Sequence, residues 1–181
     1  MIFIRGRREK AGIARNAVER NMDKKTKGEE SMAVRQEAVR DVLTRRFGAD
    51  ADPDGLSALR LMQVLRAWNP RQLSLAELES RLEDALYACV RRRWGDELLI
   101  SAPGGWRRLT TDDLAEGADA LLGLLFADLP VHAANCELVR DYAMRTGSAA
   151  ALGALCGRFG AFQSEEERAL IRRILDDRSC D

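Results

Sequence analysis

Residues Gly95 to Thr110 read GDELLISAPGGWRRLT and set the architecture that we expect for the whole chain. Two arms with apolar and aromatic residues, 97–101 and 106–110, flank a turn that contains Pro103 and Gly104. This pattern is typical of a β-hairpin, because Pro and Gly favour the turn while the arms supply strand-forming residues. We therefore predict one short hairpin at about residues 97–110, and the sequence indicates no second strand pair.

On both sides of this hairpin, apolar residues recur with the helical period of three to four residues. Two of the helical stripes follow a capping-box pattern, in which a serine precedes a glutamate by three residues: Ser74 with Glu77, and Ser164 with Glu167. The predicted fold class is therefore mainly α, a compact multi-helix domain with one short β-hairpin. Helices are expected at residues 34–47, 55–68, 74–94, 112–126, 133–145, 149–159 and 164–175.

Length and composition exclude several classes of protein. A chain of 181 residues with 46% hydrophobic residues has the usual size of one domain. No apolar run approaches the roughly 18 residues that a membrane-spanning helix needs, so we expect no membrane contact. The 29 basic and 29 acidic residues cancel, which argues against a polybasic nucleic-acid binder.

The first 31 residues differ in composition from the rest of the chain. They hold nine basic and five acidic residues, including every lysine of the protein, and they show no sustained helical or strand period. We interpret residues 1–31 as a disordered or non-native leader; a basic arm that contacts nucleic acid or an anionic surface is the alternative. Residues 27–32 back-translate to a purine-rich run before an ATG, as in a bacterial ribosome-binding site, so we expect Met32 to be the native start. The predicted domain is then residues 32–181.

A short acidic segment imitates the start of a calcium-binding loop. Asp50, Asp52, Asp54 and Gly55 have the spacing of the first loop positions, but position twelve is Leu61 where a bidentate glutamate is needed. We therefore expect these carboxylates to stabilise the N-terminus of the helix at 55–68, where negative charge suits the helix dipole.

Cysteine and histidine also give weak signals. The four cysteines, Cys89, Cys136, Cys156 and Cys180, contain no CxxC pair, so a structural zinc site is not expected. His132 precedes Cys136 by four residues, which permits a base and nucleophile pair, but a histidine at a helix start is the favoured interpretation. No secretion signal accompanies the cysteines, so we expect a reducing cytoplasm.

Sequence motifs of common enzymes are missing. There is no GxxxxGK[ST], GxGxxG, GxSxG or HExxH. We therefore predict that the protein is not an enzyme and has no catalytic residue, no metal and no cofactor.

The order of elements resembles a winged-helix domain over about residues 55–126, in which helices precede a glycine-turned hairpin, and residues 127–181 would form a helical C-terminal part. In such domains the last helix before the wing lies in the DNA major groove, and cations of the wing meet phosphate. The resemblance implies that Arg91, Arg92 and Arg93 at the helix end would contact nucleic acid or a partner, together with Trp106, Arg107 and Arg108 on the hairpin. Alternatively, the three consecutive arginines are a solvated helix C-terminus that suits the dipole.

Charge in the last third of the chain favours protein contacts over DNA. Residues 111–181 hold seven arginines and 13 acidic residues. We therefore predict a non-enzymatic cytoplasmic regulatory or adaptor protein, of bacterial origin, that acts through a protein partner or self-association. The alternative is a winged-helix DNA-binding transcriptional regulator.

Overall fold

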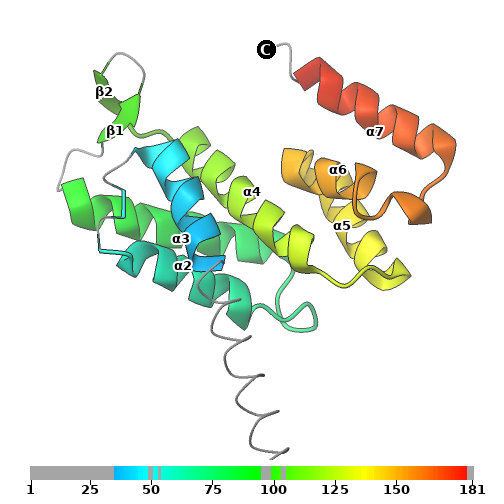
Figure 1. Ribbon diagram of the computed structural model, residues 1–181, viewed down its shortest axis with the longest axis horizontal. Helices are drawn as coiled ribbons and strands as arrows, with labels where there is room; N and C mark the ends of the chain where they lie inside the picture. The colour runs from blue at the N-terminus through cyan, green and yellow to red at the C-terminus, as the bar shows by residue number, and fades with distance from the viewer. Residues whose placement is uncertain (1–34, 49–50, 53, 95–98, 103–104, 179–181) are drawn as a thin grey trace, which may run out of the picture. The chain divides into compact units, whose positions relative to one another are not determined.

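The computed structural model describes residues 35–48, 51–52, 54–94, 99–102 and 105–178, and for residues 91–94, 101–102, 105 and 178 it describes the backbone alone (Figure 1). The chain divides into two units, residues 1–37 and 38–181. Because the described residues begin at 35, the predictions for residues 1–31 and for Met32 lie outside them.

The described chain is mainly helical with one hairpin, so the predicted fold class is confirmed. Residues 35–47 are helical and end at Gly48, which has a φ of 98°. The other elements, labelled in Figure 1, are α2 (Leu56–Ala67), α3 (Leu75–Trp94), β1 (Leu99–Ala102), β2 (Gly105–Arg108), α4 (Thr111–Asp128), α5 (Ala133–Thr146), α6 (Ala149–Cys156), the 3₁₀ turn η1 (Gly160–Phe162) and α7 (Glu165–Arg178).

The two strands pair as the sequence predicts. They are antiparallel, with Ile100 opposite Arg107 and Ser101 opposite Trp106. Ile100 is only 1% exposed, so its face of the hairpin points into the protein. The predicted turn residues Pro103 and Gly104 lie outside the described part of the chain.

Helix packing builds one core within residues 38–181. Helix α2 packs on α3, α3 on α4, and α4 on α6, which also contacts α5 and α7. The rings of Phe126 in α4 and Tyr142 in α5 are both fully buried and lie 6.1 Å apart between centroids. Further buried side chains come from every helix of this unit, among them Leu43, Phe47, Leu61, Leu78, Leu82, Leu86, Leu121, Val139, Leu152, Leu155 and Ile171.

One close contact requires a glycine. A Cβ atom added at Gly117 in α4 would lie 2.9 Å from Phe47 Cζ and 3.1 Å from Leu86 Cδ1. These distances are shorter than van der Waals contact, so the helix at 35–47 and α3 can both approach α4 only because this residue has no side chain.

Both predicted capping boxes are confirmed. The backbone N–H of Ser74 donates to the Glu77 carboxylate at 2.9 Å, and the Glu77 N–H donates back to Ser74 Oγ at 3.3 Å. Ser164 and Glu167 repeat this exchange at 3.0 and 3.1 Å. Helix α3 then continues without a break for 20 residues. The winged-helix-like order over 55–126 therefore holds two helices before the hairpin, and the helix at 35–47 supplies a third.

Candidate interaction surfaces

A groove of about 520 Å³ lies between α2 and α3. This volume is in the range of about 300–1,000 Å³ that binding sites usually occupy. Its lining consists of six apolar residues, most of them buried or half-buried, and four exposed polar residues, and we call these two sets the floor and the rim. The floor consists of Val64, Ala67, Trp68, Leu73, Leu78 and Ala85, and the rim of Arg60, Gln63, Arg81 and Asp84.

Helical spacing explains why the floor is continuous. Val64 and Ala67 are three residues apart on α2, and Leu78 and Ala85 are seven apart on α3, so each pair lies on one side of its helix. Ala67 is exposed and has a small side chain, which leaves the floor accessible at the end of α2.

Trp68 is held in place by the loop that joins the two helices. Its indole Nε1–H donates to the carbonyl of Leu73 at 2.9 Å. The N–H groups of Gln72 and Leu73 both donate to the carbonyl of Asn69, at 2.9 and 3.0 Å. Because the polar edge of the Trp68 ring is satisfied, its half-buried apolar surface forms a fixed part of the groove floor.

The two sides of the groove differ in charge. Residues 56–74, which form α2 and the following loop, contain three arginines and no acidic residue. On α3, residues 75–90 contain one arginine and four acidic residues, Glu77, Glu79, Glu83 and Asp84. Partial burial, together with the charges of Glu79 and Asp84, raises the pKa of Glu83. Of the charged residues that line the groove itself, α2 supplies Arg60, and α3 supplies Arg81 and Asp84, so the α2 side is basic and the α3 side has no net charge.

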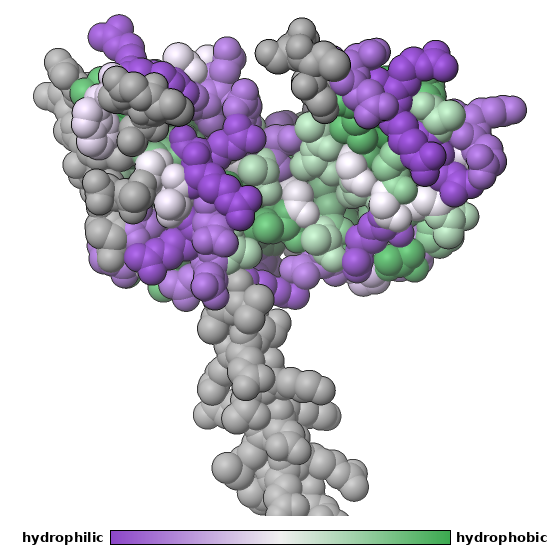
Figure 2. All heavy atoms as spheres, turned by 45° about the horizontal axis from the view of Figure 1, so that its top comes forward, coloured by the Kyte–Doolittle hydropathy of each residue, from purple (hydrophilic) through white to green (hydrophobic). Residues whose placement is uncertain are grey.

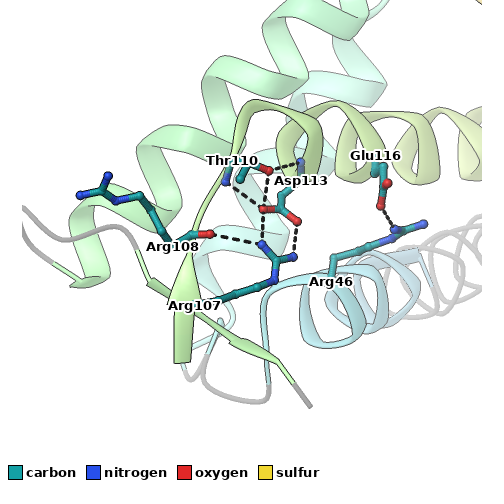
Figure 3. Close-up of polar contacts among 6 residues, drawn as sticks. All are labelled: Arg46, Arg107, Arg108, Thr110, Asp113 and Glu116. Atoms are coloured by element: carbon teal, nitrogen blue, oxygen red, sulfur yellow. Dashed lines mark hydrogen bonds and ion pairs between the residues drawn. The ribbon is translucent and has the colours of Figure 1, made fainter. Parts of the chain in front are cut away.

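The hairpin is braced against the start of α4 (Figure 3). Arg107 Nη2 lies 2.5 Å from Asp113 Oδ1, and Arg107 Nη1 lies 2.8 Å from Asp113 Oδ2. The backbone N–H and the hydroxyl of Thr110 donate to the same carboxylate at 2.8 and 2.9 Å. Arg107 first, and then the Thr110 donors, lower the pKa of Asp113 to about 2. This third capping box was not predicted from the sequence.

Figure 3 also shows an ion pair between Arg46, in the helix at 35–47, and Glu116 of α4. Both side chains are exposed, so the pair contributes little to stability.

The opposite face of the hairpin points outward. Trp106 and Arg108 are two residues apart on β2 and therefore share the face that does not hold Ile100. Trp106 is 59% exposed, and Arg108 points away from Asp113 in Figure 3.

The structure separates the site residues that the sequence proposed. Arg107 is engaged with Asp113, whereas Trp106 and Arg108 lie on the outer hairpin face. The backbone of residues 91–93 is in the last turns of α3, and their side chains lie outside the described part of the chain.

The segment that imitates a calcium loop is used for helix capping. Asp52 is 1% exposed, and its carboxylate accepts the N–H groups of Ser57 at 2.9 Å and Ala58 at 3.2 Å. Asp54 accepts the N–H of Leu56 at 3.1 Å. These bonds confirm for Asp52 and Asp54 the interpretation that the carboxylates stabilise the start of α2, whereas Asp50 lies outside the described residues. Within the described residues no group of three or more His, Cys, Asp and Glu side chains could hold a metal ion.

His132 is also a helix cap. Its Nδ1 accepts the N–H of Asn135 at 3.3 Å at the start of α5, as the helix-start interpretation predicts. Cys136 is 1% exposed, and burial raises the pKa of its thiol. Since the thiolate is the reactive form, Cys136 is a poor nucleophile in this position.

A second, smaller hollow of about 290 Å³ lies between α4 and α6. Figure 2 shows apolar surface gathered in the region of these helices. Its lining includes Gly123 and Ala150, and a Cβ added at Gly123 would lie 3.3 Å from the Ala150 Cβ. The small residues here serve the close packing of the two helices.

No helix among the described residues has the length and apolar character required to span a bilayer. The chain matches none of the family models, curated proteins or solved structures with which it was compared.

Proposed function

We propose that this protein is a non-enzymatic adaptor or regulatory module that binds another protein in the α2–α3 groove. The observation that supports this most is the apolar floor around Trp68, which remains accessible although the loop holds the ring in a fixed position. Fixed aromatic side chains beside small apolar ones are typical of the centres of protein interfaces.

The groove suits side chains of a protein better than a small polar ligand. Its polar residues are all at the rim, so no polar group on the floor would orient a small molecule. Each large apolar side chain that enters such a floor contributes about 1.5–3 kcal/mol. Three such side chains supply about 4.5–9 kcal/mol, and after an association cost of at least about 4 kcal/mol they leave at most about 5 kcal/mol, which corresponds to a Kd of a few tenths of a millimolar.

We place the protein in the cytoplasm. The three cysteines in the described part of the chain, Cys89, Cys136 and Cys156, are free thiols, which is usual in a reducing compartment.

DNA binding through the hairpin is the second candidate. The order of helices and hairpin, together with Trp106 and Arg108 on the outer hairpin face, favours it. However, Arg107 is already paired with Asp113, and the whole of α3 holds four arginines and four acidic residues. A helix without net positive charge attracts phosphate weakly, so we rank this function below protein binding.

Two surface variants distinguish the candidates. Ala67→Gln places a long polar side chain over the groove floor, and Arg108→Glu reverses the outer charge of the hairpin. With the full chain as bait, we expect the wild type and Arg108→Glu to capture the same protein and Ala67→Gln to lose it. Circular dichroism checks that both variants are folded.

A salt titration with generic duplex DNA completes the test. The proposal predicts little binding and a shallow dependence on salt concentration. A steep negative slope that Arg108→Glu reduces by about one would contradict the proposal and support the DNA alternative.

A further inference from the structure

The charges around the α2–α3 groove point to the kind of partner that it binds. We propose that the partner inserts an amphipathic α-helix whose flank over α2 is acidic. This inference rests on the proposed function, and it adds the secondary structure and the charge of the partner segment.

The backbone of the groove walls favours a helix. Eight of the ten lining residues belong to α2 and α3, whose N–H and C=O groups are bonded within their own helices except at the helix ends. An extended peptide in this groove would find no backbone partners and would leave its own polar groups unpaired. A helix satisfies its own backbone and presents apolar side chains at positions i, i+3, i+4 and i+7 to an apolar groove.

The charge of α2 favours an acidic flank. Arg60 is exposed on the rim and forms no ion pair with any described residue. Residues 56–74 around Arg60 contain no acidic residue, so the electrostatic potential on this side of the groove is positive. A partner helix with glutamate or aspartate over α2 complements these charges.

The α3 side defines the orientation of that helix. Arg81 interacts with Glu77 and helps to lower the pKa of that carboxyl, which is lowered mainly by Ser74. Asp84 lines the same side of the groove. Negative charge on the second flank of the partner would meet Asp84, and positive charge would meet Arg81, so we expect neutral residues there.

The test uses a pooled library of 16-residue helical peptides with varied large apolar residues at the four anchor positions. One flank is fixed as glutamate, glutamine or lysine, and binding to the full chain is measured by fluorescence anisotropy. We expect the glutamate-flanked peptides to bind about fivefold more tightly than the lysine-flanked ones, because glutamate forms an exposed charge pair with Arg60 and lysine is repelled by it. Added salt should reduce this preference.

Variants of the protein locate the effect. Arg60→Glu should make the protein prefer lysine-flanked over glutamate-flanked peptides. Arg108→Glu makes the same change of charge on the hairpin, and it should leave the preference for glutamate-flanked peptides unchanged. Ala67→Gln should weaken all the peptides.

Three results would overturn the inference. If peptides with all three flanks bind with equal affinity and Ala67→Gln weakens the binding of all of them, the acidic flank is overturned. The groove then remains a helix-binding site. Self-association that Ala67→Gln abolishes would assign the groove to a second copy of this chain. If no peptide binds, or if Ala67→Gln has no effect, the proposed function fails as well.

Discussion

Replacement of Asp113 by asparagine should loosen the hairpin from α4. The Asp113 carboxylate accepts hydrogen bonds from both terminal nitrogens of Arg107. It also accepts hydrogen bonds from the backbone N–H and the hydroxyl of Thr110. Asparagine keeps one oxygen for the cap but has no charge for the guanidinium. The variant therefore removes the ion pair and preserves most of the volume of the side chain.

The pKa of Asp113 sets the upper limit of the loss. Its pKa falls from 3.8 to about 2 in the folded protein, with the Arg107 guanidinium as the largest cause. At about 1.4 kcal/mol for each pKa unit, this gives roughly 2.4 kcal/mol of stability at neutral pH. The Arg107 side chain is 48% exposed, so solvent screens the pair. We expect Asp113→Asn to lower the free energy of unfolding by about 1–1.5 kcal/mol.

Urea denaturation at two pH values checks the origin of this loss. In the unfolded chain Asp113 takes up a proton near pH 4, whereas in the folded protein it stays charged down to about pH 2. Its contribution is therefore complete above about pH 4, falls as the pH is lowered and is gone below about pH 2. The difference between wild type and Asp113→Asn should be roughly half as large at pH 3 as at pH 7.

A double-mutant cycle with Arg107→Met separates the ion pair from the cap. A coupling energy near zero between Arg107 and Asp113 would refute the stabilising role of this ion pair. The same conclusion would follow if wild type and Asp113→Asn differed in stability by the same amount at pH 3 and at pH 7.

Three further variants test the packing and the caps. Gly117→Ala should destabilise the protein by about 1–3 kcal/mol, since its Cβ would lie 2.9 Å from Phe47 Cζ, and an unchanged urea midpoint would contradict that contact. Gly153→Ala in α6 is its matched control: nothing lies within 4 Å of the added Cβ, so thermal unfolding should show a gain of about 0.5–1 kcal/mol. Asp52→Ala should lower stability by about 1–2 kcal/mol because two N–H groups of α2 lose their acceptor. Calcium chloride should leave the melting temperature of the wild type unchanged, and a rise that Asp52→Ala abolishes would assign the segment to metal binding instead.

The sequence alone predicted the elements well, because local patterns determine them. The helical stripe and the capping box at Ser74 and Glu77 place the start of α3 within one residue of the observed Leu75. The Pro and Gly residues near 103–105 predict the hairpin for the same reason: turn formers act on the chain nearest to them.

The interaction surfaces were harder to predict, because they depend on how elements meet. Trp68 belongs to the apolar stripe of the helix predicted at 55–68, and nothing in that stripe shows that part of the ring stays accessible beside α3. The brace between Arg107 and Asp113 joins a strand to a helix, so it depends on the direction in which the chain leaves β2. One signal for it was present: Thr110 precedes Asp113 by three residues, which is the capping spacing with aspartate in place of glutamate.

The most direct test of the account follows the indole N–H signals of the full chain by NMR while a partner binds. The captured protein or the glutamate-flanked peptide serves as the partner, and single Trp→Phe variants assign the signals. The account predicts that the Trp68 signal shifts and the Trp106 signal stays in place. A shift of Trp106 with an unchanged Trp68 would contradict the account, because it would move binding from the groove to the hairpin.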